Sequence, residues 1–426
     1  MSENNYEKKR DLTGIILLIL SGECIYILPY VLARIFRPTF LEVFNLTNFE
    51  LGSLFTVYGI VAIFSYIFGG VIADNFSPRK LISTALFSTA LGGVLLATFP
   101  SYNILKILYG YWGITTVLLF WGAMIKATRL LGGSHSQGRA YGYLDGGRGI
   151  VAALIGSISV YIFSISLTND ISSSNIIERQ EAFKYVILFS SLLISLVGLL
   201  VLLFMNTRED IKSENLSSIN SIKKIKEVLK LQSVWLLMII IMSAYVGYKT
   251  TDIYSLYASD IMFFDQIKAS EVGSLQLYLR PIVCVLIGLL ADKTNSSSWI
   301  IIGFIIMLLG ASIFASGIIN SEMNFIFFLS LIIVAVGTYA ARALYYAIFQ
   351  EGNIPIGIMG TTVGVISVIG YTPDIFASPV MGYLLDNFPG ALGHQYVFSM
   401  LVIFSLLGLI ASIRFTKISN KKFQLI

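Results

Sequence analysis

Charged residues are scarce in this sequence. Only 12% of its 426 residues are Asp, Glu, Lys or Arg, whereas 56% are hydrophobic. A soluble domain carries roughly 25% charged residues, so the composition excludes an ordinary soluble protein and predicts a chain that crosses a membrane many times. The net charge of +5 is spread over alternate loops. It therefore does not indicate nucleic-acid binding, and we expect no nucleic-acid partner.

Cysteine and histidine are rarer still, with two residues of each type. Cys24 and Cys284 lie within apolar runs, which excludes a disulfide framework and a thiolate metal site. The sequence has no phosphate-binding loop of the Gly-Lys-Ser/Thr type, so ATP hydrolysis is not its energy source. It also shows no nucleophile–base pair. We therefore expect no cofactor, no metal and no enzymatic activity.

Long apolar runs are abundant instead. A membrane-spanning helix needs about 20 mostly apolar residues. The first run follows a polar N-terminus and has no small-residue cleavage site, so we interpret it as a retained span. The predicted fold is an all-α membrane protein with twelve transmembrane helices, near residues 12–36, 50–73, 80–99, 103–129, 139–165, 182–205, 232–257, 270–291, 298–318, 323–349, 357–384 and 395–414.

Lysine and arginine are concentrated in alternate loops between these runs. The outside turns hold little beyond Arg37, Arg179 and Lys268 if the N-terminus is cytoplasmic. Because cytoplasmic loops carry an excess of Lys and Arg, we expect both termini in the cytoplasm. Compact loops and frequent Lys, Ile and Asn favour a bacterial inner membrane.

The chain also repeats itself. Glu50-Leu-Gly-Ser-Leu54 begins the second run, and Glu271-Val-Gly-Ser-Leu275 begins the eighth, 221 residues later. Such an offset predicts a parallel duplication, with an N-terminal six-helix half (1–205), a linker (206–231) and a C-terminal six-helix half (232–426). Residues 221–231 of the linker place lysines opposite apolar residues. This pattern predicts an amphipathic helix on the bilayer surface, with a soluble linker helix as the alternative.

One motif follows the second run. Gly69-Gly70-Val71-Ile72-Ala73-Asp74-Asn75-Phe76-Ser77-Pro78-Arg79-Lys80 passes from apolar residues through a turn to two cations, and a weaker copy begins at Gly288. The glycine pair permits close approach of a neighbouring backbone. The motif, the twelve runs and the duplication resemble the major facilitator superfamily, whose fold the whole chain is expected to share.

Three further stretches narrow the resemblance. The stretches 120–126, 137–149 and 369–376 resemble an uncharacterised bacterial branch grouped near nitrate/nitrite porters.

The resemblance also bears on the solute. The drug/proton antiporters' Gly-Pro motif is missing from the fifth run, which disfavours drug export. The nitrate porters' paired arginines are half missing, because the second run has none, which disfavours nitrate itself.

Charges within the runs follow a pattern. The centres of the third, sixth, ninth and twelfth runs carry no Asp, Glu, Lys or Arg. The family resemblance implies that these four helices are outer supports and that the others line a central cavity. Because a charge in the bilayer is costly, each one should face water or a partner. The charges inside the other runs are Glu23, Arg34, Lys126, Asp145, Arg148, Lys249, Asp252, Arg280, Arg342 and Asp374.

Arg280 is the strongest candidate for solute binding, because Tyr278-Leu279-Arg280-Pro281 places a permanent cation beside a helix-weakening proline at mid-depth. It either binds an anion or forms a structural ion pair with Glu23 or Asp374. The same two alternatives, anion binding or a structural ion pair, apply to Arg342. Tyrosine adds an apolar ring with a hydroxyl. The predicted solute-binding residues are Tyr26, Tyr30, Tyr248, Arg280 and Arg342.

Glu23 and Asp374 are the candidate proton carriers. A carboxyl group in a medium of low dielectric constant can be protonated on one side of the membrane and released on the other, unless a cation pairs with it permanently. The alternative is such a pair with Arg280 or Arg342.

A third group of charges lies at the cytoplasmic ends of the runs. The resemblance implies a gating role for Asp74 with Arg79 and Lys80. The cluster around Lys126 and Arg148 suits an inner gate or latch better than a binding site. The predicted cytoplasmic gate comprises Asp74, Arg79, Lys80, Lys126, Asp145 and Arg148.

These observations predict a secondary active transporter that moves a small polar solute, anionic or zwitterionic, by alternating access. Proton-coupled uptake is favoured over an uncoupled facilitator or exchanger. A membrane receptor or scaffold without transport is the alternative from another class. The expected partners are the solute, protons and the lipid bilayer, and we expect a monomer.

Overall fold

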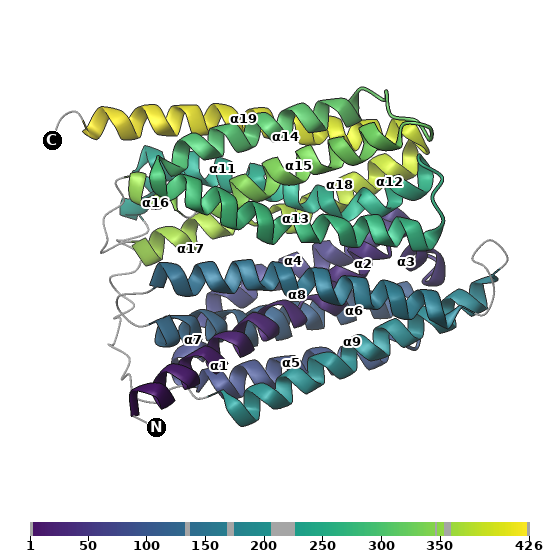
Figure 1. Ribbon diagram of the computed structural model, residues 1–426, viewed down its shortest axis with the longest axis horizontal. Helices are drawn as coiled ribbons and strands as arrows, with labels where there is room; N and C mark the ends of the chain where they lie inside the picture. Colours follow the sequence, from purple (N-terminus) through teal and green to yellow (C-terminus); the bar gives the residue numbers. More distant parts are fainter. Residues whose placement is uncertain are drawn as a thin grey trace. The chain divides into compact units, whose positions relative to one another are not determined.

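The computed structural model describes residues 3–132, 137–167, 174–205, 226–345, 347–352 and 359–423, and these form helices joined by short turns (Figure 1). No strand occurs among them. Eleven helices in this part of the chain are long and apolar enough to cross a membrane. The all-α prediction is therefore confirmed.

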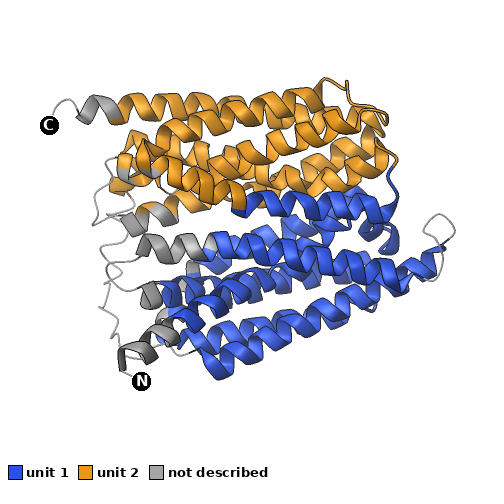
Figure 2. Ribbon diagram, in the orientation of Figure 1, with its two compact units in different colours: residues 1–212, 264–281 blue, residues 213–263, 282–426 orange. Residues whose placement is uncertain are grey.

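Close contacts divide the chain into two compact units (Figure 2). Unit 1 contains Met1–Lys212 and Phe264–Pro281, and unit 2 contains Ser213–Phe263 and Ile282–Ile426. Residues 264–281, which the sequence places in the second half, thus pack with the first unit. The predicted duplication itself stays a prediction.

Unit 1 begins with a divided first span. The helix α1 ends at Cys24, and a π-helical turn, η1, follows over Ile27–Val31. Pro29 lies within this turn and has no N–H to donate. The backbone N–H of Val31 donates to the backbone oxygen of Tyr26, five residues earlier. The elements of unit 1 are α1 (Glu3–Cys24), η1, α2 (Leu32–Ile35), α3 (Arg37–Val43), α4 (Asn48–Asn75), α5 (Pro78–Leu96), α6 (Tyr102–Gly113), η2 (Ile114–Trp121), α7 (Gly122–Gly132), α8 (Gln137–Ser166), α9 (Ile176–Phe204) and the first part of α13 (Gln266–Lys293).

Unit 2 contains a divided span as well. The predicted run at 357–384 forms two helices, α17 and α18, and Pro373 is in the first turn of the second. Proline is tolerated there because the first N–H groups of a helix have no intrahelical partner. The elements of unit 2 are α11 (Gln232–Thr250), η3 (Thr251–Ile253), α12 (Tyr254–Asp260), the rest of α13, α14 (Ser296–Ala315), α15 (Asn324–Leu344), α16 (Ile348–Glu351), α17 (Met359–Gly370), α18 (Pro373–Asn387) and α19 (Ala391–Phe423).

Local sequence fixes several helix starts. Thr47 and Glu50 form a capping box at the start of α4, with hydrogen bonds of 2.9 and 3.1 Å. Pro78 occupies the first turn of α5. The carboxylate of Glu351 accepts hydrogen bonds from the backbone N–H groups of Ser296 and Ser297, which satisfies two donors at the start of α14.

Glycines allow close helix contacts within each unit. A Cβ atom on Gly69 would lie 3.3 Å from the backbone oxygens of Val117 and Leu118 in unit 1, so Gly69 provides the close approach predicted for the glycine pair. In unit 2, a Cβ atom on Gly337 of α15 would lie 2.4 Å from the backbone nitrogen of Met307 in α14. These crossings tolerate only glycine without a shift of backbone.

The predicted linker helix is described only in part. Residues 226–229 are helical and Val228 is buried, but Leu229, which the pattern places on the same apolar face, is exposed. The earlier part of the predicted helix, including Ile222 and Ile225, lies outside the described residues.

Candidate functional site

Three buried charges from three helices meet in unit 1. The carboxylate of Glu23 on α1 lies 3.2 Å from Nε of Arg148 on α8 and 3.7 Å from Nη1 of Arg280 on α13. All three residues are less than a tenth exposed. A buried charge is stable only when it is paired, so this cluster fixes the two guanidinium groups around one carboxylate.

Gly22 next to Glu23 and Gly149 next to Arg148 allow the charged helices to approach one another closely. A Cβ atom on Gly22, next to Glu23, would lie 3.1 Å from Cδ of Arg148. A Cβ atom on Gly149 would lie 2.9 Å from Cδ of Pro281. Pro281 itself lies inside α13 without ending it. At these glycines α8 therefore approaches both α1 and α13 closely.

The tyrosines predicted on the first span have different surroundings. Tyr26 is half-buried, and the guanidinium carbon of Arg148 lies 5.6 Å from the centre of its ring. Tyr30 packs against Phe55 with ring centres 5.1 Å apart and against Tyr58 at 4.8 Å. Tyr26 thus belongs to the charge cluster of unit 1, whereas Tyr30 belongs to an aromatic group beside it.

A second charged cluster lies in unit 2. Nζ of Lys249 on α11 lies 3.3 Å from Oδ1 of Asp374 on α18 and 3.6 Å from Oδ2 of Asp252 in η3. The hydroxyl of Tyr245 donates to both oxygens of Asp374, at 3.0 and 3.1 Å. Lys249 and Asp252 are almost completely buried. One ammonium group therefore lies between two carboxylates.

Arg342 on α15 lies among tyrosines in the same unit. Its guanidinium carbon is 3.6 Å from the ring centre of Tyr248 and 5.6 Å from that of Tyr245. Tyr345 and Tyr371 are the other titratable side chains that act on its charge. Its Nη1 atom is buried and has no hydrogen-bond partner among the described residues. A buried N–H of a permanent cation without an acceptor is a site for an anionic or polar group.

Residues of the two clusters have the sequence spacing of the predicted repeat. Glu23 and Tyr245 are 222 residues apart, and both reach from the first helix of their unit to a charge on a later helix. Tyr26 and Tyr248 have the same separation, and each has an arginine over its ring. The position of the Glu23 carboxylate in unit 1 therefore corresponds in sequence spacing to the position of the Tyr245 phenol in unit 2.

The predicted gate residues are only partly described. Nζ of Lys126 donates to the backbone oxygen of Ala73 at 2.7 Å. Arg79 is half-buried and Lys80 is exposed. The side chains of Asp74 and Asp145 lie outside the described residues. Arg148, also predicted in the gate, pairs with Glu23 at 3.2 Å within unit 1, and its gating role stays a prediction.

Two arrangements were not evident from the sequence. The sequence identified Lys249 as an intramembrane charge but not as the partner of Asp374. A clue was present, because Tyr245, Tyr248, Lys249 and Asp252 follow the spacing of one helical face.

The second arrangement lies where α3 follows the first span. Nη1 of Arg179 on α9 binds both oxygens of Glu42 on α3, at 2.6 and 2.8 Å. Gln266 of α13 donates to the same carboxylate at 2.5 Å. This network holds three elements of unit 1 together at their ends.

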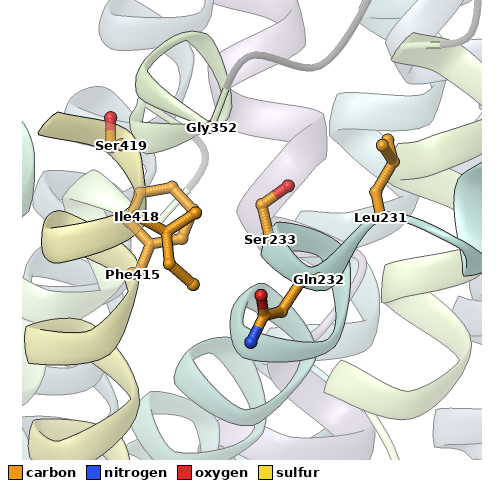
Figure 3. Close-up of a pocket in the computed structure, with 7 residues that line it drawn as sticks. All are labelled: Leu231, Gln232, Ser233, Gly352, Phe415, Ile418 and Ser419. Atoms are coloured by element: carbon orange, nitrogen blue, oxygen red, sulfur yellow. The ribbon is translucent and has the colours of Figure 1, made fainter. Parts of the chain in front are cut away.

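A pocket of about 100 Å³ lies elsewhere in unit 2, at the start of α11 (Figure 3). Phe415, Ile418 and Ser419 of α19 line it opposite Gln232 and Ser233. None of its lining residues is charged. It is therefore separate from the charged clusters. The described residues also contain no group of three or more His, Cys, Asp or Glu side chains able to hold a metal.

Comparison with known proteins supports the fold. Residues 19–373 match the family model of the Major Facilitator Superfamily. Inner membrane protein YqcE of Escherichia coli (strain K12) is 29% identical over 406 residues, covering 94% of this chain and 92% of that protein.

Solved structures give the same result. A crystal structure of a mutant of the nucleoside transporter NupG has a TM-score of 0.74 at 13% identity, covering 95% of this chain and 99% of that chain. The crystal structure of a D-xylose-proton symporter has a TM-score of 0.74 at 15% identity, covering 95% and 96%. Together with the eleven spans of the described residues, these matches confirm the twelve-helix fold predicted from the sequence.

Proposed function

The chain belongs to the Major Facilitator Superfamily, and on that premise we propose that it is a secondary transporter, not an enzyme, that carries a small anionic or zwitterionic solute by alternating access. It is a multi-pass integral membrane protein with similarity to inner membrane proteins. Both termini lie in the cytoplasm in this proposal, and the protein works as a monomer in a bacterial inner membrane.

The environment of Arg342 is the observation that carries the proposal. A guanidinium group keeps its charge at any physiological pH. Here it lies on the ring of Tyr248, and its buried Nη1 has no hydrogen-bond partner among the described residues. A solute carboxylate would supply both an acceptor and a countercharge, in a charge-assisted bond that is stronger than a neutral one.

The proposal gives Arg280 a different role from the one that the sequence alone favours. Its guanidinium group lies 3.7 Å from Glu23, so the ion pair with Glu23 is formed within unit 1. Arg280 and Arg148 then have a structural role in unit 1 as partners of Glu23, whereas Arg342 and Tyr248 bind the solute in unit 2.

Asp374 is the proton carrier in this proposal. Its cation, Lys249, has a second carboxylate in Asp252 at 3.6 Å and therefore keeps a partner when Asp374 is protonated. Glu23 instead holds two guanidinium groups, which suits a fixed structural role. The proposed cytoplasmic gate keeps its six predicted residues, Asp74, Arg79, Lys80, Lys126, Asp145 and Arg148.

Thermal unfolding of the purified protein with a defined set of solutes tests this proposal. The set contains gluconate, glucuronate and lactate as anions, alanine as a zwitterion, and xylose and uridine as neutral comparators. A solute that binds only the folded protein stabilises it by about 2.7 kcal/mol at a hundredfold excess over its dissociation constant. We expect at least one anion or zwitterion to raise the unfolding temperature, and Arg342→Gln to abolish the increase.

The control is Arg414→Gln, which removes an arginine from an exposed position of α19 and should leave the increase intact. Stabilisation by neutral solutes alone would contradict an anionic or zwitterionic solute. Stabilisation of Arg342→Gln equal to that of the wild type would contradict the site. A solute that binds but never crosses a proteoliposome membrane would favour the receptor over the transporter.

A further inference from the structure

One helical face in unit 2 carries both the proton site and the solute site. Tyr245, Tyr248 and Lys249 lie on α11, and Asp252 follows one turn later. Residues three and four apart are neighbours on a helix surface. This face meets Asp374 of α18 through Lys249 and Arg342 of α15 through Tyr248.

Tyr245 contacts both sites. Its hydroxyl donates to the two oxygens of Asp374 at 3.0 and 3.1 Å. Its ring lies 5.6 Å from the guanidinium carbon of Arg342 and 5.8 Å from the ring of Tyr248. Tyr245 is therefore the side chain through which a change at Asp374 reaches Arg342.

The chemistry of this hydrogen bond depends on the charge of Asp374. An ionised carboxylate is only an acceptor, so it binds the phenolic proton of Tyr245. A protonated carboxyl group has a donor of its own. When a proton from water adds to one oxygen of Asp374, that O–H donates to the phenol oxygen, and the phenolic O–H is released to donate elsewhere.

We propose that Tyr245 is the residue that couples proton binding to solute binding. Protonation of Asp374 turns the Tyr245 hydroxyl from its carboxylate toward the solute held at Arg342, and the same proton removes a negative charge from the vicinity of the incoming anion. Lys249 keeps its charge partner, because Asp252 lies 3.6 Å away. One proton and one anion then bind cooperatively. This inference rests on the proposed function.

The groups that face Asp374 are consistent with a single switch. Lys249 and Tyr245 on α11 and Asp252 in η3 are the charged and titratable side chains that act on it. Arg342 and Tyr371 lie one contact further away, and the ring centre of Tyr371 is 4.9 Å from that of Tyr245. On the side of α19, Phe376 of α18 packs against Phe404, with ring centres 5.9 Å apart.

The test is the pH dependence of binding by the full-length purified protein. The probe is whichever member of the anion set, gluconate, glucuronate or lactate, stabilises the wild type most. Because Asp374 must be protonated to release Tyr245, wild-type affinity should be highest at acidic pH and fall by about tenfold or more as the pH rises, the effect of a hydrogen bond to a charged group. Tyr245→Phe should bind more weakly than the wild type at acidic pH and should show a smaller fall in affinity with rising pH, because only the loss of negative charge at Asp374 still favours the anion.

Asp374→Asn supplies the second variant. An amide cannot be ionised, so this variant should lose the fall in affinity with rising pH. Tyr383→Phe removes a hydroxyl from an exposed position of α18 and should reproduce the wild-type profile.

The outcomes separate the two proposals. An unaltered pH profile in Tyr245→Phe would overturn the coupling role of Tyr245, even with normal probe binding. If Tyr245→Phe does not fold, an Asp374→Asn profile equal to that of the wild type overturns it. Failure of the wild type to bind any anion or zwitterion at any pH would instead overturn the proposed function.

Discussion

At the scale of single residues, the buried charges of unit 1 depend on one another. Glu23 supplies a carboxylate to Arg148 and to Arg280, and all three are buried. Removing one member of a buried ion pair leaves an uncompensated charge, which costs more than the pair contributes. Glu23 is therefore the residue of this cluster whose replacement should destabilise the protein most.

Glu23→Gln should destabilise the protein, because two buried guanidinium groups lose their shared countercharge. We expect the free energy of unfolding to fall by about 3–5 kcal/mol, measured by denaturant unfolding of the purified protein. Glu271→Gln makes the same chemical change at an exposed position of α13 and should alter the free energy by less than about 0.5 kcal/mol. Equal effects of the two substitutions would show that the cluster is not a stabilising unit.

The charges themselves were predictable from sequence, but their partners were not. Arg280, Glu23 and Asp374 are conspicuous because each interrupts an apolar run. Arg148 pairs with Glu23 within unit 1, a contact between distant parts of the sequence that hydropathy and charge alone do not predict. Its predicted place in the gate stays a prediction.

At the scale of helices, packing depends on glycines at the crossings. Within unit 2, α14 and α15 approach closely where Gly303 faces Gly337. Hydropathy predicted both spans but not their crossing, because a glycine within an apolar run has the same hydropathy whether it contacts a helix or lipid. Run length also did not predict that the span at 357–384 is divided just before Pro373.

Gly337→Ala should destabilise unit 2, because the added Cβ atom would lie 2.4 Å from a backbone nitrogen of Met307. Overpacking of this kind costs about 1–3 kcal/mol, which a lower unfolding temperature would reveal. Gly288→Ala is the matched control, since its Cβ atom would meet nothing within 4 Å among the described residues. An unchanged unfolding temperature in Gly337→Ala would contradict the crossing.

At the scale of the whole molecule, the two compact units carry different charged clusters. Unit 1 holds a carboxylate between two arginines, and unit 2 holds an arginine among tyrosines beside a lysine with two carboxylates. The twelve-helix fold followed from run lengths, because a bilayer sets the length of every span. The identity of the solute did not follow, because a permanent cation fixes the sign of its partner and little about its remaining shape.

The most direct test of proton-coupled anion transport is the internal pH of proteoliposomes that contain a trapped pH-sensitive dye. The anion that stabilises the wild type most is added outside, with equal pH on both sides. We expect the interior to acidify as anion and proton enter together, and we expect no such change with Arg342→Gln, Asp374→Asn or empty liposomes. Entry of the labelled anion without acidification, or acidification equal in all four samples, would contradict proton-coupled anion transport.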